Sequence, residues 1–170
     1  MALIVEDGTG KSDAESLCSV AVADNYHVSI GNEAAWVFLS DAVKEQCLRK
    51  ATAFMSGRYR ARLGGYRKTV TQSLDFPRSL MPIKDALSKT YYSDSAVPLA
   101  VQQACASLAL RASTSTLLED QKRSKSSVTI GPISTTYDRA SPIATQYKEI
   151  DAMMEPFLCI NSGVAEMVRV

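Results

Sequence analysis

The sequence predicts a mainly α protein, a small helical bundle with a β-hairpin and extended termini. Three observations support this fold class. Apolar residues recur at helical spacing in two long stretches, at about residues 41–55 and 98–118. A third stretch, residues 128–137, is rich in β-branched residues and is interrupted by Gly131-Pro132, which is typical of a small hairpin or a bent strand.

The chain before the first long helix divides into two expected elements. Residues 1–18 combine an apolar start with two glycines, which indicates a short extended segment followed by a turn. Ser19 can cap a helix that runs to about Ile30, where Gly31 stops it. Three of its residues fall on one side: Val20, Ala23 and His27. Trp36, which follows, is expected to anchor the core.

The clearest amphipathic stretch begins at Ser40 or Asp41, whose side-chain oxygens can accept from the first free amides, and runs to about Met55. The residues expected to be buried are Val43, Cys47, Leu48, Ala51 and Phe54. The residues expected to remain outside are Lys44, Glu45, Arg49 and Lys50.

The middle of the chain is expected to be irregular before it becomes helical again. Gly64-Gly65 indicates a flexible loop, and residues 77–95 a long connection without regular structure. Pro98 marks the first turn of the next helix, which fades by Leu118. Its expected buried stripe is Val97, Val101, Ala104, Cys105, Leu108 and Ala112.

The last third of the chain contains the expected hairpin, one short helix and a tail. Residues 119–127 are polar and indicate a linker, and a helix is expected at about residues 147–158. The apolar face of this helix comprises Ile150, Met153, Met154 and Phe157. We therefore expect one helical domain at residues 1–158, in which residues 119–137 form a linker and hairpin insertion, and a docking tail at residues 159–170.

Charge is unevenly distributed along the chain. Seven basic residues and no acidic residue lie between Arg49 and Lys68, although the formal net charge of the protein is only +1. In the first 33 positions, acidic residues outnumber basic residues, of which Lys11 is the only one. A surface divided in this way suits an anionic partner or head-to-tail packing of copies. A solvated helix end with ordinary salt bridges is the alternative.

Basic and aromatic residues alternate in this stretch. Arginines can hold phosphates while tyrosine rings stack on bases, which is the chemistry of sequence-tolerant single-strand binding. In the alternative, Tyr59 and Tyr66 pack in the core and the arginines pair with acids of a neighbouring copy. The candidate DNA-contacting or subunit-contacting residues are Arg58, Arg60, Arg62, Arg67 and Lys68.

The sequence gives little support to catalysis. His27 is the only histidine and is expected to be structural, and the stretch Gly8-Thr-Gly-Lys-Ser12 lacks the first glycine of a phosphate-binding loop because Val5 stands there. The four cysteines are expected to be reduced core residues: Cys18, Cys47, Cys105 and Cys159. We expect no enzyme activity, no metal and no cofactor.

Neither a secretory signal nor an apolar run of roughly 20 residues is recognisable, so we expect a soluble protein that is made in the cytoplasm and does not enter a membrane.

Several short stretches, in order and spacing over nearly the whole chain, resemble a known family. They include Ser19-Val-x-x-Ala-Asp24-x-Tyr26, Leu48-Arg-Lys-Ala-Thr52, Leu74-Asp-Phe-Pro-Arg78, Val97-Pro98 and residues 128–137. Together they resemble the head-to-tail adaptor proteins of tailed bacteriophages, many of which are labelled DnaT-like single-stranded-DNA-binding proteins. One departure is Phe76, where compared members often carry tryptophan.

The resemblance implies a structural protein of the virion rather than an enzyme. Such adaptors assemble as homo-oligomeric rings, typically of twelve copies, between the portal protein and the tail or head-completion proteins at the head-tail junction. Double-stranded DNA passes through the ring. The apolar residues of the tail are the candidate portal-docking residues: Val164, Met167, Val168 and Val170. The alternative function is a DnaT-like single-stranded-DNA-binding module.

Overall fold

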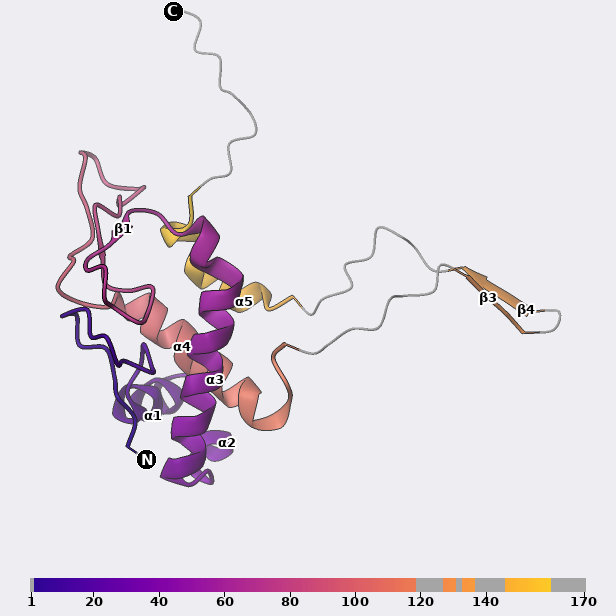
Figure 1. Cartoon of the computed structure of the whole chain (residues 1–170). Helices are drawn as coiled ribbons and strands as arrows, with labels where there is room; N and C mark the ends of the chain where they lie inside the picture. The colour runs from indigo at the N-terminus through magenta and orange to yellow at the C-terminus, as the bar shows by residue number, and fades with distance from the viewer. Residues whose placement is uncertain (1, 119–126, 131–132, 137–145, 160–170) are drawn as a thin grey trace, which may run out of the picture.

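The structure, a computed structural model, describes residues 2–118, 127–130, 133–136 and 146–159. Within these ranges the chain forms five α-helices, two short 3-10 helices and two separate two-stranded ladders. The predicted mainly α fold class is confirmed. Figure 1 shows helices α3 and α4 crossing in the body of the molecule, and α4 also contacts α1 and α5.

The N-terminal helices frame one end of this body. Helix α1 (Val20–Ser29) is capped by Ser19 as predicted, since the Ser19 hydroxyl oxygen accepts from the amide of Val22 at 3.2 Å. Helix α2 (Glu33–Val37) was not predicted, because five residues are too few to show helical periodicity. Trp36 lies on α2 and is fully buried, so its predicted role as a core anchor is confirmed.

Helix α3 (Asp41–Tyr59) is longer than predicted and buries most of the expected residues. Two expectations for its first turns are wrong, because Val43 is 37% exposed whereas Lys44 is buried. The Lys44 ammonium pairs with Asp24 at 2.9 Å and lies 5.6 Å from the centre of the Trp36 ring. These partners come from α1 and α2, so helical periodicity within α3 could not reveal them.

Helix α4 (Leu99–Thr114) follows Pro98 and ends four residues before the predicted end at Leu118. Its alanines allow close contact with α3. The predicted stripe is buried throughout: Val97, Val101, Ala104, Cys105, Leu108 and Ala112.

The two antiparallel ladders differ in length and in their place along the chain. Strands β1 (Tyr66–Arg67) and β2 (Arg78–Ser79) pair antiparallel beside the body, so the expected flexible loop at Gly64-Gly65 instead leads into an ordered ladder. Strands β3 (Ser127–Ile130) and β4 (Ile133–Thr136) form the predicted hairpin, with Ser127 opposite Thr136. Figure 1 shows this hairpin apart from the helices.

The last described elements close the fold beside the C-terminal end of α3. Helix α5 (Lys148–Met154) continues into the 3-10 helix η2 (Glu155–Phe157). Leu158 forms an antiparallel bridge with Leu63, just after the 3-10 helix η1 (Arg60–Arg62). The predicted docking tail lies outside the described residues, except for Cys159. In the part of the chain that is described, no helix has the length and apolar character to cross a membrane.

Candidate functional site

The carboxylate of Asp75 organises one half of the basic stretch. Its side chain is 4% exposed, and Oδ1 accepts from Arg60 Nε at 2.8 Å and from Arg67 Nη2 at 3.0 Å. Oδ2 is buried without a hydrogen-bond partner among the described residues. The arginine side chains are 56% and 34% exposed, so both guanidinium groups reach the surface. Two candidate residues are therefore held by an acid of their own chain.

Arg78 fixes the loop on which this cluster stands. Its guanidinium donates to the carbonyl oxygens of Gly64 at 2.6 Å, Gly65 at 2.7 Å and Asp75 at 3.3 Å. Burial lowers the pKa of this guanidinium below its ordinary value. Gly65 has φ of 63°, and a Cβ there would lie 2.5 Å from the carbonyl oxygen of Ser79, so only glycine fits. Arg78 thus acts as a structural brace.

The other residues around Arg78 are equally structural. Gln72 is buried and donates to the carbonyl oxygens of Leu74 and Pro77, at 2.9 and 3.1 Å. Phe76 is 1% exposed and packs edge-on against Phe157 at 6.2 Å between ring centres. The stretch Leu74-Asp-Phe-Pro-Arg78 therefore holds a long loop in one conformation and presents Asp75 to the arginines.

Asp151 on α5 organises the other half of the basic stretch. Arg58 donates to it through Nε at 3.0 Å and Nη2 at 2.9 Å, and the Tyr59 hydroxyl donates at 2.7 Å. Burial alone would raise the pKa of Asp151, but the hydrogen bonds from Arg58 and Tyr59 hold it below its ordinary value. Exposed Arg62 lowers this pKa further by its charge and lies with Arg58 and Asp151 at a surface hollow of about 410 Å³.

Lys68 contacts the loop that resembles a phosphate-binding loop. Its ammonium donates to the carbonyl oxygen of Gly8 at 3.1 Å. The amides of Gly8, Gly10 and Lys11 all donate to the buried carboxylate of Glu6, at 2.8 to 2.9 Å. Amides that could cradle a phosphate are thus satisfied by a side chain of the same loop. This geometry agrees with the sequence argument against a nucleotide site.

The five candidate residues lie along one region but are not a free basic patch. Arg58, Arg60 and Arg67 form ion pairs within the chain, and Lys68 donates to a backbone carbonyl. The alternative interpretation expected the arginines to pair with acids of a neighbouring copy. For Arg58, Arg60 and Arg67, the structure instead shows ion pairs with acids of the same chain. Because Asp75 and Asp151 are the only carboxylates in these ion pairs, positive charge remains in excess. Sequence reasoning missed both acids, because neither lies at a helical or strand spacing from the arginines that it binds.

The two tyrosines of this region differ in burial. Tyr59 is 1% exposed, as the core alternative expects, and burial followed by the neighbouring Asp151 raises its pKa. Tyr66, beside Arg67, is 72% exposed. One aromatic ring is therefore open to stacking, whereas the other is committed to the core.

His27 lies in a structural setting. It is 1% exposed, its Nε2 lies 3.1 Å from the carbonyl oxygen of Ala106, and its ring centre lies 4.7 Å from that of Trp36. Burial lowers its pKa below the ordinary value. Cys18, Cys47 and Cys105 are buried as predicted, but the expectation that Cys159 is a core residue is wrong, because it lies exposed after Leu158, the last buried residue that the structure describes.

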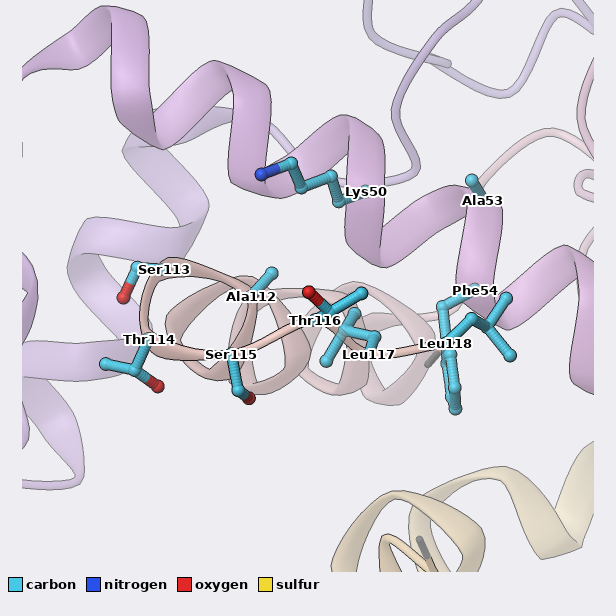
Figure 2. A pocket seen from close by; sticks show the side chains of 10 residues that line it. All are labelled: Lys50, Ala53, Phe54, Ala112, Ser113, Thr114, Ser115, Thr116, Leu117 and Leu118. Atoms are coloured by element: carbon cyan, nitrogen blue, oxygen red, sulfur yellow. The ribbon is translucent and has the colours of Figure 1, made fainter. Parts of the chain in front are cut away.

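A separate hollow of about 560 Å³ lies between α3 and the end of α4 (Figure 2). Phe54 and Ala112 are buried beside it, whereas Ala53 and Leu118 are exposed. The figure shows Leu118 close to Phe54, with Lys50 farther along α3. This groove lies on a different part of α3 from the arginines.

The fold and the arginine surface define a small helical protein with a rigid, partly neutralised cationic face. The whole chain, residues 1–170, matches the family model described as "Putative DnaT-like ssDNA binding protein". The chain belongs to this family. Searches of curated proteins and of solved structures give no match.

Proposed function

We propose that this protein is a structural head-to-tail adaptor of a tailed-phage virion. In this proposal, copies form a ring under the portal, extend the channel for double-stranded DNA and provide the attachment site for the tail. The function involves no catalytic turnover. The proposal rests on the resemblance described above and on the way the basic stretch is anchored.

The anchoring of the arginines is the observation that carries the proposal. A channel that DNA must pass needs positive charge that is fixed in place and too weak to trap phosphates. Arg58, Arg60 and Arg67 are each held by a carboxylate, which reduces the attraction for a phosphate while leaving a positive surface. A single-strand binder instead stacks successive bases on several rings, and of the two tyrosines weighed in the basic stretch only Tyr66 is exposed, since Tyr59 is buried.

The β3–β4 hairpin provides further support for assembly. A two-stranded hairpin is marginally stable on its own in water. A neighbouring copy is a natural source of cover for such a hairpin. A contact in which one copy supports an element of the next is heterologous, and such contacts build a ring when the rotation between successive copies closes.

Electron microscopy of the protein with and without portal tests the proposal. We expect rings of this chain bound to the portal, with the isolated protein free to remain monomeric because weak contacts can require the portal as a template. Connector particles that contain portal but no rotationally repeated copies of this chain would overturn the proposal.

The alternative is a single-stranded-DNA-binding module, as the family description suggests. Exposed Tyr66 beside Arg67 is the observation in its favour. If this module is the function, Tyr66→Ala should weaken binding of an oligonucleotide by about 1–3 kcal/mol. Tyr91→Ala, which alters another partly exposed tyrosine, is the matched control. The adaptor proposal expects no measurable single-strand binding by either the native protein or these variants at physiological salt.

A further inference from the structure

The Glu6 loop, residues 6–11, folds around its own carboxylate. Glu6 is 4% exposed, and its Oε1 accepts from the amides of Gly8 at 2.9 Å and Gly10 at 2.8 Å. Its Oε2 accepts from the amide of Lys11 at 2.9 Å. Three backbone amides of one short loop therefore converge on a single buried anion.

Glycine makes this convergence possible. Gly8 has φ of 99° and Gly10 has φ of 82°, and both values lie in the left-handed region that other residues rarely adopt. Backbone amides in such turns point into a common concavity that binds anions. A Cβ on Gly8 would overlap the carbonyl oxygen of Ser95, so the Glu6 loop is also seated against the segment before α4.

Contacts that do not involve the Glu6 carboxylate hold the backbone of the loop. The Thr69 hydroxyl donates to the carbonyl oxygen of Gly10 at 3.3 Å. Because this carbonyl and the Lys11 amide share one planar peptide, the bond also fixes the direction of the amide. The amide of Ser73 donates to the carbonyl oxygen of Lys11 at 3.0 Å. The concavity is therefore expected to persist when the carboxylate is removed.

The charge and the position of the loop also suit an oxyanion. The Lys68 ammonium donates to the carbonyl oxygen of Gly8 at 3.1 Å, which places a positive charge at the loop. The carboxylate of Asp7 pairs with the Lys11 ammonium at 2.9 Å and is thereby neutralised. Asp7 and Thr9 are exposed, so the loop lies at the surface, where a small ion can reach it.

We propose that the Glu6 loop is an oxyanion site that Glu6 occupies as an internal ligand. The carboxylate keeps the phosphate groups of nucleic acids and nucleotides out of a concavity that would otherwise bind them. Glu6→Ala removes a group of the size of acetate, so the emptied site should take acetate or inorganic phosphate from solution. The proposal stands independently of the adaptor function.

Amide resonances of the isotope-labelled full-length protein test the proposal. In Glu6→Ala, titration with sodium phosphate at constant ionic strength should shift the amide resonances of Gly8, Gly10 and Lys11 to saturation. Sodium acetate should shift the same three resonances. The native protein should show neither effect over the same concentrations, because its own carboxylate fills the site.

Melting temperatures provide a second readout. Glu6→Ala should melt about 5–10 °C below the native protein in a buffer without oxyanions, because three amides lose a charged acceptor. Phosphate at ten times its dissociation constant should shift the folding equilibrium of this variant about elevenfold and recover roughly 3–5 °C. The native protein is the reference, since phosphate also stabilises proteins by exclusion from their surface. If Glu6→Ala is unfolded without oxyanions, it should refold when phosphate or acetate is added.

Asp7→Ala supplies the matched control, because it removes the same charge from the same loop and leaves Glu6 in place. It should gain no saturable shift at the three amides. Equal phosphate binding by Asp7→Ala and Glu6→Ala would assign the effect to net charge and overturn the proposal. Unshifted amides in Glu6→Ala, or no recovery of its stability by either ion, would overturn it too, as would phosphate binding at these amides in the native protein.

Discussion

Asp75 and Asp151 determine what the arginines of this protein can do. Each buried or half-buried carboxylate binds guanidinium groups from a different part of the chain, so the arginines are fixed in direction and partly neutralised. Glu6 has the corresponding role for backbone amides, because it occupies the site that a phosphate would need. At the scale of single residues, acids within the fold set the chemistry of the basic stretch.

Removing the charge of Asp75 should show how far this carboxylate stabilises the fold and neutralises Arg60 and Arg67. Asp75→Asn should lower the free energy of unfolding by about 1–3 kcal/mol, since Asp75 is buried but Arg60 is more than half exposed. The same change should strengthen binding to double-stranded DNA, because Arg60 and Arg67 are released. Urea unfolding and a DNA titration measure the two effects.

Asp85→Asn is the control for this prediction, because it alters net charge equally at an exposed position in the loop before α4. If both variants bind DNA equally well, the excess charge of the whole protein matters and the Asp75 cluster does not.

His27 should make stability depend on pH. Burial lowers its pKa in the folded protein, against a smaller raising effect from Asp24, whereas Lys44 lowers it further. Above about pH 6.5 the ring is neutral in both states, and below it the unfolded chain takes up the proton more readily. The free energy of unfolding should therefore fall as the pH drops below about 6.5 towards the folded pKa.

His27→Gln should abolish this part of the pH dependence, and we expect it to cost about 1–2 kcal/mol at pH 8 through altered packing. Chemical unfolding at pH 8, 6.5 and 5.5 provides the comparison. A variant that folds stably but loses all biological function would contradict the structural role of His27 and favour an enzyme.

At the scale of elements, α3 connects the two surfaces of interest. Its middle lines the apolar groove, and its last turn carries Arg58 to Asp151 on α5. The first turn is tied to the N-terminal helices through Lys44 and Asp24. The β3–β4 hairpin contrasts with this arrangement, since Figure 1 shows it away from every helix.

Replacing residues 127–136 by a glycine-serine segment of equal length should separate folding from assembly. We expect the melting temperature of the helical body to change by less than about 3 °C, because the hairpin adds little packing to it. Ring formation on the portal should be lost. Calorimetry and sedimentation measure these outcomes, and a large fall in melting temperature would show that the hairpin supports its own helices.

At the scale of the whole molecule, ion pairs within the chain reduce the division of charge that the sequence suggests. Glu15 pairs with Arg49 and Asp24 pairs with Lys44, so acids near the N-terminus neutralise bases of α3. Positive charge remains in excess around Arg62 and Lys68, which form no ion pair in the described part of the chain. These two residues are the best candidates for contact with a partner outside the chain.

Arg62→Gln combined with Lys68→Gln should weaken binding of the assembled protein to double-stranded DNA. If both residues contact phosphates, the slope of log affinity against log salt should fall by about two. Lys84→Gln combined with Lys89→Gln removes the same charge elsewhere and should have a smaller effect. Equal salt slopes for the native protein and the Arg62/Lys68 variant would exclude these residues from the DNA contact.

The sequence alone determined the helices whose burial follows a local rule. Helix α1 was predictable from its capping residue Ser19, and α3 and α4 were predictable from apolar spacing, which acts within one segment. The expected side-chain cap at Ser40 or Asp41 is not formed at the start of α3. The β-branched residues around Gly131-Pro132 predicted the β3–β4 hairpin. The basic stretch was equally visible as a local excess of charge.

Only the tertiary structure decided how those charges are used. Asp75 lies 15 residues after Arg60, and Asp151 lies 93 residues after Arg58, so neither pair follows from helical or strand spacing. The same reason explains buried Lys44, the short β1–β2 ladder braced by Arg78, and the groove beside Leu118. Each depends on segments that only folding brings together, because hydrogen bonds and desolvation act between neighbours in space rather than in sequence.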